Sequence, residues 1–407
     1  MREVPVAAPA HRNPWEISLA ARVQMLRAEQ VRVAYYYRWP DASTFRYRCY
    51  NTAMALNAHV PGVSASWFFE EDGERLLEIV QDVDVLVVCR VPYSDQVAQL
   101  MAVARRAGTR VVFDVDDYVF DLAIVPEVVK VLDQYEGDAQ PAEAMWNWWF
   151  AYFARVRRTM ELADEVLVTN DFLAARTREV VDLPVRVVPN FMGTDQIAFS
   201  RQLVAARDAA GDPDDGTIHL GYFSGTPTHN RDLAIAAGAV ARLMRRDPSV
   251  RLRLVGFLDL KESPLGRVAD RIDQVPLTDY LNLQRLIAEV DISLAPLQDN
   301  RFTNCKSELK YFDAAAVGVP SMASPTFTMS AAIEHGVTGL LVRVDEWDEH
   351  LDAVVRRHRE DGGDSARRMG RRAFEHAISA YSPQAMVDRV VEGLGLGVAV
   401  APDSQLV

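Results

Sequence analysis

Residues 217–232 read TIHLGYFSGTPTHNRD, and this stretch decides the fold class. An apolar run that ends in a glycine-containing turn and leads into a helix is typical of one unit of a parallel α/β sheet. Such a turn directs backbone N–H groups and the positive end of the helix toward an anionic ligand. Arg231, at the expected start of the helix, would add a cation that binds phosphate through two nitrogens. In the structural alternative, Asn230 simply caps the helix.

The same alternation of short apolar runs and helix-length segments continues in both directions along the chain. It predicts strands at 31–37, 83–88, 110–114, 165–169, 185–188, 217–223, 251–255, 291–295, 319–323 and 339–342. This pattern predicts two doubly wound α/β domains whose strand ends face each other across a cleft. We expect a first domain at 1–195, a linker at 196–216, a second domain at 217–382, and a final segment, 383–407, whose helix crosses back to the first domain before a tail.

Composition excludes several classes of protein. The 407 residues carry a formal charge of −13, which argues against nonspecific binding of nucleic acid. The three cysteines are far apart, so the sequence predicts neither a disulfide framework nor a zinc site. No signal peptide or membrane-spanning run is recognisable, and we expect a cytoplasmic protein. Only four lysines accompany 40 arginines, so the pair Lys306 and Lys310 stands out.

That lysine pair lies in a second informative stretch, residues 300–320, which read NRFTNCKSELKYFDAAAVGVP. Ser307 is expected to cap a helix, and Lys306, Lys310 and Asp313 then share one face of it. In isolation, the two lysines could equally form ion pairs with Asp313 in solvent.

Together these stretches resemble the retaining GT-B glycosyltransferases of glycosyltransferase family 4. The resemblance covers most of residues 217–345 and includes SGTPTHNRD, DISLAPLQDNRF, KSELKYFDAAAVGVPSMAS and AAIEHGVTGLLV. It implies a GT-B fold and transfer of a sugar from a nucleotide-sugar donor with retention of configuration, without a metal or other cofactor. By the same resemblance, Arg231 and Lys310 stabilise the diphosphate leaving group. The other donor-binding residues it implies are Ser224, Gly225, Thr226, His229, Lys306, Ser307, Glu308 and Asp313.

The sequence departs from the family pattern at two positions. Asp313 stands where the family usually has a glutamate that binds ribose. The aspartate keeps the negative charge, but its side chain is one methylene group shorter. Cys305 stands where a carboxylate normally contacts the donor sugar. Either Lys306, Ser307 or Glu308 substitutes for that carboxylate, or the donor lacks a hydroxyl there. The departures leave two alternatives to a transferase: a GT-B-fold sugar-nucleotide epimerase or hydrolase, and a catalytically silent nucleotide-sugar-binding protein.

Candidate acceptor-binding residues lie in the first half. In FDVDDY, residues 113–118, the pair Asp114 and Asp116 has the spacing of a metal-binding DxD motif. We favour a role for Asp116 or Asp117 in orienting an acceptor hydroxyl over metal binding; a structural capping role is the third alternative. Arg38 and Arg46 follow the first strand and are expected to face the cleft, where they would contact donor phosphates or an anionic acceptor.

The acceptor itself stays open: a saccharide, a specialised metabolite or a lipid-linked intermediate. The aromatic run 145–158, MWNWWFAYFARVRR, is expected mainly to pack in the core. The same run is also compatible with an acceptor pocket or with weak contact at the inner face of a membrane.

Overall fold

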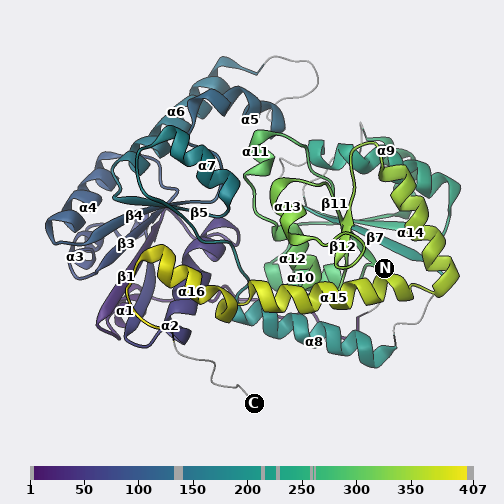
Figure 1. The fold of residues 1–407 in the computed structure, drawn as a ribbon, viewed down its shortest axis with the longest axis horizontal. Helices are drawn as coiled ribbons and strands as arrows, with labels where there is room; N and C mark the ends of the chain where they lie inside the picture. Colours follow the sequence, from purple (N-terminus) through teal and green to yellow (C-terminus); the bar gives the residue numbers. More distant parts are fainter. Residues whose placement is uncertain are drawn as a thin grey trace.

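The computed structural model describes residues 4–132, 141–211, 216–225, 230–256, 260 and 263–400. These residues form two six-stranded parallel sheets, one in each half of the molecule (Figure 1). The first has the order β2-β1-β3-β4-β5-β6, with β1 Val31–Tyr37, β2 Val63–Phe69, β3 Val85–Cys89, β4 Arg110–Val115, β5 Glu165–Val168 and β6 Val185–Val187. The second has the order β12-β11-β10-β7-β8-β9, with β7 Ile218–Phe223, β8 Val250–Val255, β9 Ile272–Val275, β10 Ile292–Ala295, β11 Ser321–Ala323 and β12 Gly339–Leu341.

Helices cover both sheets, which explains why the central strands are continuous apolar runs. All residues of β3 and β7 are buried, as expected for parallel strands packed on both faces. The helices of the first half are α1 Leu19–Leu26, α2 Asn51–His59, α3 Arg75–Ile79, α4 Asp95–Arg106, α5 Val125–Val131, α6 Glu143–Glu161 and α7 Asp171–Val180. Those that follow are α8 Thr194–Ala210, α9 Asn230–Arg246, α10 Tyr280–Ala288, α11 Arg301–Asn304, α12 Leu309–Ala315, α13 Phe327–Ala332, α14 Trp347–Asp361, α15 Asp364–Tyr381 and α16 Pro383–Leu394.

The segment between the two sheets is mostly helical. The expected linker at 196–216 coincides largely with α8, which packs against α10. Its turn signals lie only at the end, where Gly211 closes α8 in the left-handed conformation. The apolar positions Ile197 and Leu203, both buried, explain why the preceding residues form a packed helix.

The last helix returns to the first half. Figure 1 shows α15 running along the second half and α16 lying over the first, beside α2. Gly393 of α16 approaches β6 so closely that an added Cβ would lie 2.3 Å from a methyl group of Val188. Arg186 of β6 donates a 2.7 Å hydrogen bond to the carbonyl of Glu392, which fixes the end of α16.

Two strands had no counterpart in the sequence expectations, namely the edge strands β2 and β9. The helical stretch that begins at Thr44 passes through a π-helical turn, Arg46–Tyr50, and continues into α2. Within the described residues, no helix has the length and apolarity needed to cross a membrane.

Candidate functional site

The turn after β7 lies at the carboxyl end of the central strand of the second sheet. Ser224 is buried and Gly225 is exposed, while Thr226 and His229 fall outside the described residues. Ser224 passes so close to Gly256 that a Cβ on Gly256 would lie 2.1 Å from the Ser224 carbonyl oxygen, which explains the glycine. Arg231 lies in the first turn of the 17-residue helix α9, where the helix dipole favours an anion.

Lys310 of α12 approaches the same strand end from the neighbouring strand–helix unit. Its ammonium group donates a hydrogen bond to the carbonyl of Phe223 and lies 4.9 Å from the ring centroid of Tyr222. Burial lowers the pKa of Lys310 to about 8, against the opposing effect of Asp232 and Asp313. A lysine cation is therefore fixed at the last residue of β7, directly before the turn.

Two residues just before this helix, Ser307 and Glu308, have partners outside the turn after β7. The helix begins at Leu309, and Ser307 does not cap it: its hydroxyl accepts a 3.0 Å hydrogen bond from Asn190. The expectation of a Ser307 cap is wrong because Glu308 occupies the cap position. Burial raises the pKa of Glu308, which hydrogen-bonds Tyr381.

Asp313 also faces the first half. Its carboxylate accepts a 2.7 Å hydrogen bond from the side-chain amide of Gln196 and a 3.4 Å bond from the hydroxyl of Tyr47. Burial raises its pKa, an effect that Arg46 opposes. Asp313 is thus part of the contact between the two halves in this structure.

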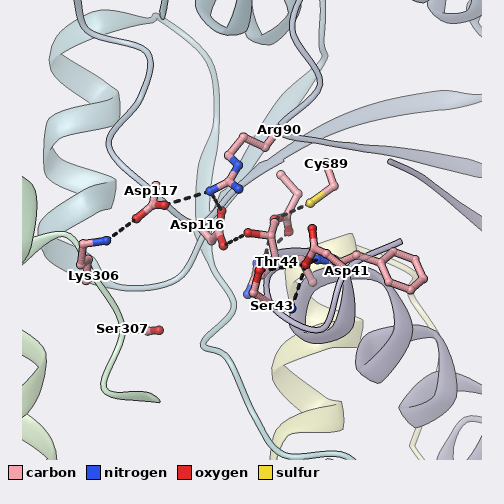
Figure 2. A network of polar contacts seen from close by, with 12 residues as sticks. Asp41, Ser43, Thr44, Cys89, Arg90, Asp116, Asp117, Lys306 and Ser307 are labelled. Atoms are coloured by element: carbon pink, nitrogen blue, oxygen red, sulfur yellow. Dashed lines mark hydrogen bonds and ion pairs between the residues drawn. The ribbon is translucent and has the colours of Figure 1, made fainter. Parts of the chain in front are cut away.

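Two consecutive carboxylates form the centre of a polar network at the carboxyl edge of the first sheet (Figure 2). Arg90 donates through one nitrogen to Asp116 and Asp117, at 2.9 Å each. Thr44 donates a 2.8 Å hydrogen bond to the other oxygen of Asp116, and the ammonium of Lys306 lies 3.5 Å from Asp117. The network therefore connects the loops after β1, β3 and β4 with the second half.

Arg90 has an unusual backbone. Its φ of 47° is the one positive φ of a non-glycine residue in the chain as far as the structure describes it. Strained backbone of this kind persists only where surrounding contacts hold it, and it is concentrated at functional sites. Burial raises the pKa of Asp116, an effect that Arg90 opposes and Asp117 reinforces.

The first aspartate of the DxD spacing has a separate role. Asp114 is buried and accepts two hydrogen bonds from Arg48, at 2.8 and 2.7 Å. This ion pair joins the π-helical turn to β4. Asp114 and Asp116 thus have different partners, and the described residues contain no group of three or more histidine, cysteine, aspartate or glutamate side chains that could hold a metal ion.

The two arginines expected to contact ligands differ in exposure. Arg46 is buried: it donates to Gln196 at 3.0 Å and stacks on Tyr280 at 4.4 Å. Arg38 is exposed, pairs with Glu70 at 3.0 Å and stacks on Trp39 at 4.3 Å. Neither belongs to the network of Asp116 and Asp117.

Cys305 does not present its thiol to the donor turn. Its side chain is fully buried with Phe302 in the apolar cluster of the first half, and its carbonyl accepts a 2.7 Å hydrogen bond from Asn170. Burial raises the pKa of this thiol. The position at which the family has a carboxylate is thus an apolar contact between the halves.

Sequence reasoning missed Arg90, Thr44, Asn190 and Gln196. Each contacts a predicted site residue, but none lies in a recognisable motif. Only the position of Arg90 relative to a strand could have indicated its role. It directly follows a buried strand, β3, at the edge of the sheet where ligands bind.

With this geometry in view, comparison with known proteins is informative. Residues 218–359 match the family described as glycosyl transferases group 1. The matched residues resemble a glycosyl transferases group 1 domain, and they contain the β7 turn, Arg231, Lys310 and Asp313.

Curated relatives of the chain include the D-inositol 3-phosphate glycosyltransferases of Nocardia farcinica and Pseudarthrobacter chlorophenolicus. The first is 30% identical over 154 residues, and the match covers 34% of this chain and 32% of the relative. The second is 30% identical over 162 residues, covering 37% of each. The chain thus matches about a third of the length of these relatives.

Similarity to solved structures extends beyond the matched residues. Anabaena Alr3699/HepE, solved in complex with UDP-glucose, has a TM-score of 0.56 at 13% identity, covering 89% of this chain and 99% of that one. Sucrose-phosphate synthase from Thermosynechococcus elongatus has a TM-score of 0.53 at 17% identity, covering 88% and 97%. These matches confirm the GT-B fold with its two parallel sheets.

Proposed function

We propose that this protein transfers a sugar from a nucleoside-diphosphate donor to an acceptor hydroxyl, with retention of configuration and without a metal. One observation carries the proposal: Arg231 and Lys310 lie at the carboxyl edge of the second sheet, and Lys306 connects that half to Asp116 and Asp117 at the edge of the first. The glycosyl transferases group 1 match supports the donor side. The proposed division of labour is acceptor binding by 1–195 and donor binding by 217–382.

The donor would be held mainly by its phosphates. Lys310 would exchange the Phe223 carbonyl for a phosphate oxygen, and Arg231 would add a second cation at the start of α9. Lys310 is fixed by the protein before the reaction, and both cations would stabilise the negative charge that develops on the departing diphosphate. This arrangement supports the proposed independence of a divalent metal, which activity in excess EDTA would test.

The remaining donor residues would act around that diphosphate. We propose that the backbone of Ser224 and Gly225, followed by Thr226 and His229, lines the phosphate turn. Asp313 would bind the ribose. Lys306, Ser307 and Glu308 would contact the donor sugar in place of the carboxylate absent at Cys305.

On the acceptor side, Asp116 or Asp117 would accept the hydrogen bond that the attacking hydroxyl group donates. Ionised carboxylates are acceptors only, so a hydroxyl placed against them points its oxygen away, toward the donor. Arg90 holds both carboxylates and is the positioning residue of this pair.

The decisive experiment measures release of nucleoside diphosphate from a panel of nucleotide-sugars, with and without candidate acceptors. Release that depends on an acceptor, with a product of retained anomeric configuration by NMR, supports the proposal. Release without any acceptor favours a hydrolase, and conversion of the sugar nucleotide favours an epimerase. Binding of UDP-sugars without turnover under every condition would make the protein a silent binder.

A further inference from the structure

The exposed aromatic residues of α6 lie beside the carboxylate network. Of the seven tryptophans, two are exposed: Trp39, which follows β1 at the carboxyl edge of the first sheet, and Trp148 of α6. Trp148 is 57% exposed and stacks in parallel on Tyr152, with ring centroids 5.3 Å apart and an interplanar angle of 10°. Stacked pairs of this kind present a flat apolar surface with polar tips.

This aromatic pair is fixed next to Arg90. The turn of α6 that follows Tyr152 is joined to the loop after β3 by two hydrogen bonds: Arg155 donates to the carbonyl of Tyr93 at 2.7 Å, and the Tyr93 N–H donates to the carbonyl of Arg155 at 2.9 Å. Burial raises the pKa of the Tyr152 hydroxyl; Arg90 opposes this effect and Asp117 and Asp116 reinforce it, because these groups lie near the ring. The aromatic surface and the two carboxylates are therefore parts of one region.

We propose that Trp148 and Tyr152, together with Asp116 and Asp117, form a subsite for a neutral saccharide acceptor. The inference rests on the proposed glycosyl transfer and names the class of its acceptor. A sugar ring offers an apolar C–H face for the aromatic pair and hydroxyl donors for the carboxylates. Few other acceptors present both surfaces on one small ring.

Charge balance favours a neutral acceptor. The network contains two carboxylates, Asp116 and Asp117, and two cations, Arg90 and Lys306. Its charges therefore cancel, and no excess of positive charge is left to attract a phosphorylated or carboxylated acceptor.

A lipid surface is the competing partner for exposed aromatics, and the composition of α6 argues against it. Helices that lie on anionic membranes place lysine or arginine beside their aromatic residues. Residues 143–154 of α6 contain no basic residue. The arginines that follow are engaged within the protein: Arg155 with Tyr93, and Arg157 and Arg158 with Glu161.

The test compares Trp148→Ala with Phe150→Ala in the full-length protein. Phe150 is the matched control because it is an exposed aromatic residue of the same helix that pairs with Trp146, not with Tyr152. Binding of maltose, cellobiose, lactose and sucrose would be measured by saturation-transfer NMR in the presence of UDP. Vesicles containing phosphatidylglycerol would be tested in parallel by co-sedimentation.

We expect at least one of these disaccharides to bind, with the strongest saturation on ring C–H protons. Trp148→Ala should weaken this binding about tenfold, equivalent to about 1.4 kcal/mol, whereas Phe150→Ala should not. Tyr152→Phe, which keeps the ring, should retain most of the binding. No disaccharide binding in the wild type, or an equal loss in both alanine variants, would overturn the proposal. Vesicle binding that depends on Trp148 would also overturn it, in favour of a membrane contact.

Binding of UDP and turnover of UDP-glucose, measured in the same samples, distinguish failure of the acceptor subsite from failure of the proposed function. If UDP binds and the donor is consumed but Trp148→Ala leaves saccharide binding unchanged, only the acceptor subsite is wrong. If the wild type neither binds nor consumes any nucleotide-sugar, the proposed function itself fails.

Discussion

At the scale of single residues, the lysine at the proposed donor turn is held by a protein group before any ligand arrives. Lys310 contacts the Phe223 carbonyl, and the backbone of Arg231 lies in the first turn of α9. Lys310 therefore does not have to be ordered at the moment of reaction, which is the condition under which fixed charge stabilises a leaving group best. Removing either charge should therefore affect turnover more than it affects folding.

Lys310→Ala and Arg231→Ala should each lower kcat/KM for the nucleotide-sugar by about a hundredfold, the usual loss when one group that stabilises transition-state charge is removed. Steady-state kinetics with UDP-glucose would measure it. Arg245→Ala is the matched control, since Arg245 is exposed at the other end of α9. Unchanged kinetics in both test variants would remove the proposed donor site.

The depressed pKa of Lys310 predicts a pH dependence of donor binding. With a pKa of about 8, the free protein carries the charge below pH 8 and loses it as the pH rises. The affinity for UDP should therefore fall between about pH 7 and pH 9.5, by up to roughly tenfold per pH unit above the pKa. Isothermal titration calorimetry would follow this fall. Lys310→Arg, which stays charged throughout, should flatten the profile, and a flat wild-type profile would contradict the role of Lys310.

At the scale of secondary-structure elements, the local sequence pattern predicted most strands. The elements that it did not predict are those whose structure depends on packing against other parts of the chain. The run RQLVAARDAAGDPDDG contains turn residues, yet α8 extends to Ala210 because Ile197 and Leu203 are buried. The edge strands β2 and β9 were not predicted from the sequence, for a related reason. Their residues become strands by pairing with β1 and β8, which are distant in sequence or separated by a loop.

Helix α16 allows a test of how closely the last helix of the chain packs on the first half. Gly393→Ala would place a methyl group against Val188 and should lower the free energy of unfolding by about 1–3 kcal/mol, as overpacking usually does. Gly238→Ala in α9 is the control. Its added Cβ would lie 3.3 Å from the far end of the exposed Arg242 side chain, and alanine favours the helix. Urea denaturation would compare the two; equal effects would show that α16 is not packed closely on β6.

At the scale of the whole molecule, the two halves are joined by polar contacts at the sheet edges and by helices that cross between them. Lys306–Asp117, Ser307–Asn190 and Asp313–Tyr47 connect the edges, and Arg301 of α11 binds Glu127 of α5 through three hydrogen bonds. Several of these residues are also proposed donor ligands. Donor binding would therefore compete with contacts between the halves.

Glu127→Ala should favour separation of the halves because it removes a contact that involves no proposed ligand residue. Small-angle scattering without ligand should show a larger radius of gyration, with a change in unfolding free energy of no more than about 1 kcal/mol for this partly exposed pair. Glu143→Ala, at an exposed position at the start of α6, should leave the scattering unchanged. Identical curves for both variants would show that this ion pair does not hold the halves together.

The sequence by itself determined the two parallel sheets and indicated the proposed donor motifs, because strand periodicity, turn glycines and helix starts are local properties of the chain. The residues that face Asp116 and Asp117 were decided only by the tertiary structure. Arg90, Thr44 and Lys306 are distant in sequence and meet only because parallel strands bring their carboxyl ends to the same edge. The same holds for Asp313 and Cys305, whose contacts with the other half depend on how the two sheets are placed.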